Sequence, residues 1–167
     1  MSRRDDVVKW LAYTIAFLVG WFFVAGIFAR LPVAGCVPTL IPAAVAIAAV
    51  LEGSVGGAVF GLCLGLFGCL SGAGGASLIL CGTLIGMLAG LLQERPRRSE
   101  APACLLSAAA AIAGTELVQL LLNRLTGKGG WGAVSRIAAG EFLYSLAVAV
   151  PAYFLFHFVY RRFGSGK

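Results

Sequence analysis

Six apolar runs follow one another along this chain, and they limit its fold more than any other feature does. The runs cover residues 7–29, 37–51, 55–70, 77–92, 103–122 and 137–160. A backbone surrounded by lipid must form its hydrogen bonds within the chain, and a helix does so within one segment. No run alternates polar with apolar residues, as the strands of a membrane barrel do. We therefore expect an all-α, polytopic integral membrane protein, a compact bundle of about six transmembrane helices.

Composition excludes the soluble alternatives. Of the 167 residues, 60% are apolar and 12% are charged, whereas a soluble domain is about 45–50% apolar and about 25% charged. These values exclude a soluble globule, a disordered chain and a coiled coil. A spanning helix needs about 20 residues, so no room remains for a separate soluble catalytic domain. We expect one membrane domain, in which a cytoplasmic basic loop (93–102) separates a four-helix part (7–92) from a two-helix part (103–160).

The positions of Lys and Arg predict the orientation. They lie at the ends of apolar runs rather than on one basic face, so we expect membrane lipid and no nucleic acid as a partner. With six crossings, nine of the 13 basic residues share one side and four share the other. The richer side should be cytoplasmic, which places both termini in the cytoplasm. The nine are Arg3, Arg4, Lys9, Arg95, Arg97, Arg98, Arg161, Arg162 and Lys167, and the four are Arg30, Arg124, Lys128 and Arg136.

Several runs depart from a simple spanning helix. The run 7–29 is too long for the apolar core of a cleaved signal peptide, so we expect it to be retained. The runs 37–51, 55–70 and 77–92 are short for a hydrocarbon core of about 30 Å, and they would thin the bilayer or be shielded by neighbours. Pro38 and Pro42 begin the second helix, where proline is tolerated, whereas Pro151 should kink the sixth.

Two series of glycines predict a tightly packed hairpin. In each series the glycines recur every fourth residue, which places them on one helix face, where they let two backbones approach closely in lipid. A short turn over 71–76 joins the two helices, so we expect them to pack face to face. The series are Gly57, Gly61 and Gly65 in the third run, and Gly82, Gly86 and Gly90 in the fourth.

A milder small-residue face occurs on the first run, at Ala12, Ala16 and Gly20. It would pack against another helix of this chain or against a partner protein. Packing within the chain is the interpretation we favour.

Polar side chains concentrate in the last two runs. Glu116, Gln119 and Asn123 form one stripe on the fifth helix, and Glu141 lies near Tyr144 and Ser145 on the sixth. Ionisable groups within a membrane normally face the bundle interior and find a partner, for which Arg136 and Arg124 are candidates. The glutamates would either line a small-molecule or proton pathway or join helices by hydrogen bonds. We favour the second hypothesis, because the first four runs supply few polar groups.

No residue pattern indicates catalysis, a metal or a cofactor. The cysteines, Cys36, Cys63, Cys69, Cys81 and Cys104, form no C-x-x-C pair, and His157 is the only histidine. We therefore expect a non-enzymatic protein without cofactors, with the cysteines as small packing residues and His157 as an interfacial aromatic. The stretch 123–135 should be the longest external loop, with Trp131 as an interface anchor.

The stretch 36–98 resembles the bacterial rod shape-determining protein MreD family. The shared pattern is a Pro-led helix (37–51), a Glu-Gly turn at Glu52 and Gly53, a glycine-series helix, a Gly-rich turn and a Gly-Leu-Leu helix before a basic loop. Length and helix number agree with the family. The chain departs from it at Thr39 and Cys69, where the family often has acidic residues.

The resemblance implies a function without catalysis. MreD-like proteins are scaffolds of the cell-elongation machinery for rod shape and peptidoglycan synthesis in the bacterial cytoplasmic membrane. Their bitopic partner is MreC, which links them to MreB, RodA and a penicillin-binding transpeptidase. The alternative is the substrate-binding S-component of an energy-coupling factor vitamin transporter, a family similar in size and fold. Its Ala-x-x-x-Ala coupling motif is matched by Ala12 and Ala16, and Asn123, Trp131, Glu141 and Tyr144 would contribute to its ligand pocket.

Overall fold

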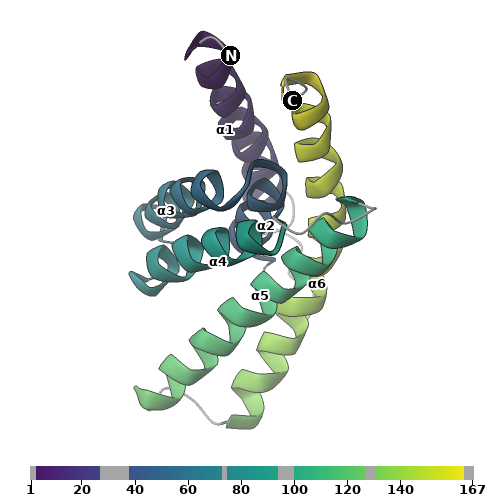
Figure 1. The fold of residues 1–167 in the computed structure, drawn as a ribbon. Helices are drawn as coiled ribbons and strands as arrows, with labels where there is room; N and C mark the ends of the chain where they lie inside the picture. The colour runs from purple at the N-terminus through teal and green to yellow at the C-terminus, as the bar shows by residue number, and fades with distance from the viewer. Residues whose placement is uncertain (1–2, 27–37, 73–74, 94–99, 127–130, 164–167) are drawn as a thin grey trace.

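The computed structural model describes residues 3–26, 38–72, 75–93, 100–126 and 131–163, and all regular structure in these ranges is helical. The all-α expectation is confirmed. The helices are α1 (Arg3–Gly26), α2 (Ile41–Glu52), α3 (Ser54–Leu70), α4 (Ser77–Gln93), α5 (Glu100–Leu125) and α6 (Trp131–Phe163) (Figure 1).

Two expected loops are shorter than predicted. Residue 93 ends α4 and residues 100–102 begin α5, so only 94–99 of the expected loop 93–102 lie outside the described residues. The expected external loop 123–135 is also largely helical, because α5 extends to Leu125 and α6 already starts at Trp131. Asn123 and Arg124 continue α5 past its apolar run, and α6 begins six residues before its run, in the mixed stretch 131–136. Hydropathy alone does not detect these extensions. Trp131 is thus a helix residue rather than a loop residue.

Three of the helices are long and apolar enough to cross a membrane. Their candidate spans are Val7–Gly26 in α1, Ala101–Leu125 in α5 and Arg136–Arg162 in α6. The other three are shorter apolar helices of 12, 17 and 17 residues. At about 1.5 Å per residue, α2 is only about 18 Å long.

The shortest helix, α2, forms the centre of the molecule. Every residue from Ile41 to Val50 is buried, and α2 packs against α3, α4, α5 and α6. Its sequence explains this position, because five alanines leave a thin helix that four neighbours can approach. Pro42 lies in its first turn, where the backbone N–H has no helical partner.

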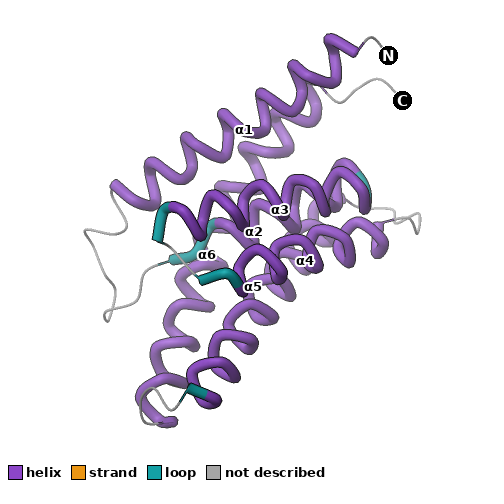
Figure 2. The backbone as a smooth tube through the Cα atoms, turned by 90° about the vertical axis from the view of Figure 1, so that its left-hand side faces the viewer, coloured by secondary structure: helices purple, strands orange, loops and turns teal. Residues whose placement is uncertain are grey.

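One hairpin and a pair of longer helices pack around α2. The helices α3 and α4 lie side by side in both views of the backbone, and α5 lies beside the first half of α6 (Figures 1 and 2). The first turn of α1 and the last turn of α6 lie at the same end of the molecule (Figure 2). The helix α6 continues through Pro151 without a break, and its two halves run in different directions (Figure 1). The expected kink is therefore present.

Aromatic side chains attach α1 to the rest of the bundle. Tyr13 lies 5.7 Å from Phe156 of α6, and Phe17 lies 5.6 Å from Phe67 of α3, measured between ring centroids. Tyr13 and Phe17 are fully buried. Many large apolar side chains of α1, α3, α4 and α6 remain exposed, as expected of surfaces in contact with lipid or with another membrane helix.

Candidate functional site

The glycine series place the backbones of α3 and α4 in contact. A Cβ added at Gly82 would lie 2.7 Å from the carbonyl oxygen of Gly61, and one added at Gly57 would lie 2.6 Å from that of Gly86. At Gly65 the nearest atom would be the Cα of Ile79, again at 2.7 Å. No side chain fits at these positions. The faces that the sequence predicts to meet are therefore opposite each other in the structure.

The ends of this hairpin explain two further glycines. Gly90 of α4 packs against the backbone of Ser54 and Gly53 where α3 begins. Gly53 separates α2 from α3 with φ of 93°, and Gly72 follows α3 with φ of 74°. Both angles lie in the left-handed region, which glycine occupies without strain.

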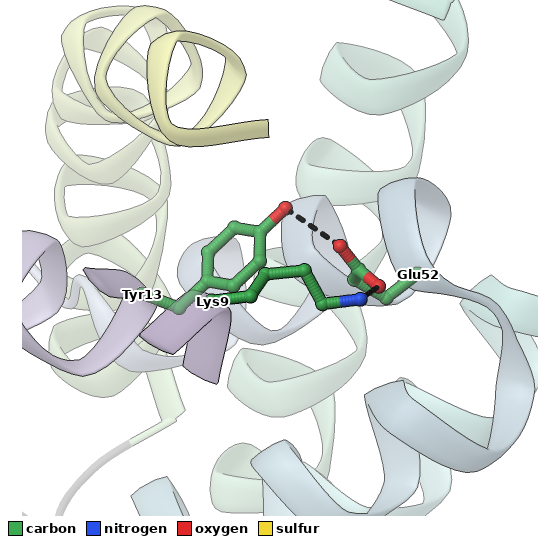
Figure 3. A network of polar contacts seen from close by, with 3 residues as sticks. All are labelled: Lys9, Tyr13 and Glu52. Atoms are coloured by element: carbon green, nitrogen blue, oxygen red, sulfur yellow. Dashed lines mark hydrogen bonds and ion pairs between the residues drawn. The ribbon is translucent and has the colours of Figure 1, made fainter. Parts of the chain in front are cut away.

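An ion pair connects α1 to the end of α2. Lys9 Nζ lies 2.5 Å from Glu52 Oε2, and the two side chains are 12% and 9% exposed. The Tyr13 hydroxyl donates a hydrogen bond of 3.0 Å to Glu52 Oε1. The two donors come from α1 and converge on one carboxylate (Figure 3). The Trp10 ring lies under the ammonium, 5.8 Å from Nζ to its centroid.

This contact is not evident from the sequence, where Lys9 has the position of a charge flanking a helix and Glu52 that of a turn residue. The sequence does contain one indication that Lys9 has a partner. Lys9 and Tyr13 are four residues apart on one helix face, and Lys9 lies inside an apolar run, where a charge normally has a partner. Nothing in the sequence identifies that partner, since Glu52 is 43 residues away.

A second polar contact joins the start of α2 to α6. The backbone N–H of Thr39 donates to Ser145 Oγ at 2.8 Å, and the two hydroxyls lie 3.2 Å apart. Ser145 is fully buried. Its hydroxyl thus satisfies a backbone group that precedes α2 and has no helical partner.

The polar stripe of α5 comes together with α6 around a cavity of about 270 Å³. The cavity is lined by Glu116, Gln119, Asn123 and Glu141, together with Leu120, Ile137 and Ala138. Glu116 is 6% exposed, and its Oε1 atom has no hydrogen-bond partner among the described residues. Four of the polar residues singled out from the sequence therefore share one site.

Neither Arg136 nor Arg124, the two expected cations, is among the residues that line this cavity. Within the described part of the chain, Lys9 and Glu52 form an ion pair, and Arg136 is exposed. Tyr144 is half-buried and does not line the cavity. In the described ranges, no group of three or more His, Cys, Asp or Glu side chains is placed to hold a metal ion.

The small-residue face of α1 points into the molecule. Ala16 is 5% exposed, Ala12 packs on the core, and a Cβ at Gly20 would lie 3.1 Å from Leu40. These residues therefore contact helices of this chain. His157 stacks on Tyr153 of the same helix, with ring centroids 5.4 Å apart. Cys104 is fully buried, whereas Cys63 is exposed on α3.

Comparison with protein-family models, with curated proteins and with solved structures found no match for this chain.

Proposed function

We propose that this chain is a non-enzymatic membrane scaffold of the bacterial cell-elongation machinery, similar to MreD. It crosses the cytoplasmic membrane six times, with both termini in the cytoplasm. It binds an MreC-like bitopic protein and, through that protein, MreB, RodA and a penicillin-binding transpeptidase.

The observation that carries this proposal is the closely packed unit formed by α2, α3 and α4. These helices make up most of the stretch that resembles MreD. Within it α2 is enclosed, and glycines bring the backbones of α3 and α4 into contact. The Glu-Gly turn of the resemblance is held from α1 by Lys9 and Tyr13. Residues that define the resemblance thus also make the central contacts of the fold.

The outer surface supports a partner in the membrane. Only 22% of the 18-residue apolar segment by which α1 could cross a membrane is buried. Within it, the side chain of Phe22 is 75% exposed. A groove of about 360 Å³ separates α1 from α3, with Trp10, Leu18, Val59 and Phe67 in its walls. Helices associate in lipid through close packing of such surfaces. A partner helix would therefore gain most contact along α1.

An even number of crossings, as six would be, is supported by the arrangement of the helix ends. A chain whose ends lie on one side of a membrane crosses it an even number of times. The first turn of α1 and the last turn of α6 lie at one end of the molecule (Figure 1). Since α1, α5 and α6 supply three candidate spans, α2, α3 and α4 would supply an odd number.

One observation favours the S-component as a second candidate. The cavity between α5 and α6 contains Asn123 and Glu141, two of the residues that a vitamin pocket would use. The α1 face opposes this candidate, because Ala16 of the coupling motif is buried within the chain.

Photo-crosslinking in native membranes tests the proposal. A photoreactive amino acid is placed at one exposed position on each of α1, α3, α4 and α6, namely Phe22, Val59, Leu84 and Phe158, and at Ala46 as a fully buried control. We expect a bitopic protein with a periplasmic coiled coil to be crosslinked, most strongly from Phe22, and nothing from Ala46. Absence of any protein adduct, together with a vitamin co-purifying with the chain, would replace the scaffold by the S-component.

A further inference from the structure

Two adjoining cavities lie along the polar stripe of α5, one between α5 and α6 and the other beside the start of α2. The first, of about 270 Å³, holds Glu116 and Asn123. The second, of about 360 Å³, has largely apolar walls that include Trp21, Pro38, Pro42 and Leu78. Gln119 and Glu141 line both cavities. One site therefore has a polar end with two carboxylates and an apolar end with an indole ring.

The polar end lacks a counter-charge. Glu116 is more than nine-tenths buried and lines the first cavity, and its Oε1 atom has no partner among the described residues. A buried polar atom without a hydrogen bond is costly, and a carboxyl group within a membrane normally has a partner. Within the described residues no ion pair is recorded for Glu116 or Glu141. A cationic ligand would supply the missing partner.

The side chains around the polar cavity favour an organic cation over a metal ion as the ligand. Beside the two carboxylates stand the side-chain amides of Gln119 and Asn123, whose oxygens accept hydrogen bonds from an ammonium group. Among the described residues no group of three or more metal-binding side chains is present. The apolar cavity next to the carboxylates suits a hydrophobic body, and its volume falls in the range of about 300–1,000 Å³ typical of small-molecule sites.

We propose that this site binds a primary ammonium compound, with the ammonium between Glu116 and Glu141 and a compact apolar body beside Trp21. The same chemistry is offered by a free organic amine and by the amine headgroup of a phospholipid. The proposal does not depend on the scaffold function, because it concerns the inner face of α5 and α6 and requires no partner protein.

The test uses the full chain in nanodiscs of phosphatidylglycerol, which carries no amine, and phenethylamine as the probe. Binding is measured by titration calorimetry and by the shift of the thermal midpoint. We expect saturable binding to the wild type that weakens at least tenfold in Glu116→Gln and in Glu141→Gln. Glu100→Gln, at the opposite end of α5, is the matched control and should bind as the wild type does. The neutral analogue 2-phenylethanol should bind at least tenfold more weakly.

A comparison of two lipids distinguishes a phospholipid headgroup from a free amine as the source of the ammonium group. If the headgroup is the natural occupant, nanodiscs containing phosphatidylethanolamine should weaken phenethylamine binding severalfold. If a free amine is the occupant, the two lipids should give equal affinities.

Three results would overturn the proposal: no saturable binding in phosphatidylglycerol, equal affinity in both glutamine variants and the wild type, or a midpoint shift given by NaCl or CaCl₂ but not by phenethylamine. Glu141 is only half-buried, so Glu141→Gln decides the test if Glu116→Gln does not fold. Photo-crosslinking to a bitopic partner is independent of all these results, so each proposal can fail alone.

Discussion

At the scale of single residues, the stability of the bundle depends on a few polar contacts in apolar surroundings. Lys9, Tyr13 and Glu52 form the clearest example, because two donors from α1 share one carboxylate at the end of α2. Charges were visible in the sequence, but their pairing was not, since distant residues meet only through the fold. The stripe of Glu116, Gln119 and Asn123 was predictable because helical periodicity alone places those residues on one face.

Replacing Glu52 tests the ion pair. Glu52→Leu should destabilise the protein by about 2–3 kcal/mol, because it leaves the ammonium of Lys9 without a partner in a mostly buried position. Tyr13→Phe removes one hydrogen bond and should cost about 1 kcal/mol. Unfolding in mixed micelles, followed by helical circular dichroism, measures both. In the double variant Lys9→Met with Glu52→Leu, much of the loss should be recovered, and a strictly additive loss would show that the pair is not coupled.

Replacing Ser145 tests the contact that precedes α2. Ser145→Ala should destabilise the protein by about 1–2 kcal/mol, because the N–H of Thr39 loses its acceptor. The control is Thr126→Val, whose hydroxyl bonds only within its own exposed helix end and which should change stability by less than about 0.5 kcal/mol. Equal midpoints for Ser145→Ala and the wild type would mean that water satisfies the N–H of Thr39.

At the scale of helices, small residues decide which faces meet. The pairing of α3 with α4 follows from the spacing of Gly57, Gly61 and Gly65 against Gly82 and Gly86, and it could be predicted from the sequence. The central position of α2 could not. A run of alanine and branched apolar residues is equally suited to lipid and to protein, and only its shortness hinted at shielding by neighbours. Helix ends also escaped prediction, because α5 continues through polar residues past its apolar run and α6 begins six residues before its own run.

Adding a single methyl group tests the hairpin. Gly61→Ala should destabilise the protein by about 1–3 kcal/mol, because the new Cβ collides with the backbone of Gly82. Gly114→Ala is the matched control, since nothing lies within 4 Å of the added Cβ. It should be neutral or stabilising by up to about 1 kcal/mol through helix propensity. Thermal unfolding in detergent compares the two, and equal midpoints would contradict backbone contact between α3 and α4.

At the scale of the whole molecule, the fold encloses a thin helix and exposes apolar surface around it. Ile41–Val50 is buried, whereas large side chains such as Phe22 of α1 and Phe158 of α6 point outward. This distribution suits a protein whose surroundings are lipid and other helices. The overall class was predictable from hydropathy, but the packing order of the helices was not, because all six runs are apolar.

Reporter fusions test the six-crossing arrangement most directly. Green fluorescent protein and alkaline phosphatase are each fused after Glu52, Leu70, Gln93, Leu125 and Phe163, the last described residues of α2 to α6. We expect fluorescence without phosphatase activity after Glu52, Gln93 and Phe163, and phosphatase activity without fluorescence after Leu70 and Leu125. Phosphatase activity after Phe163 would place the end of α6 outside the cytoplasm and contradict six crossings with both termini inside.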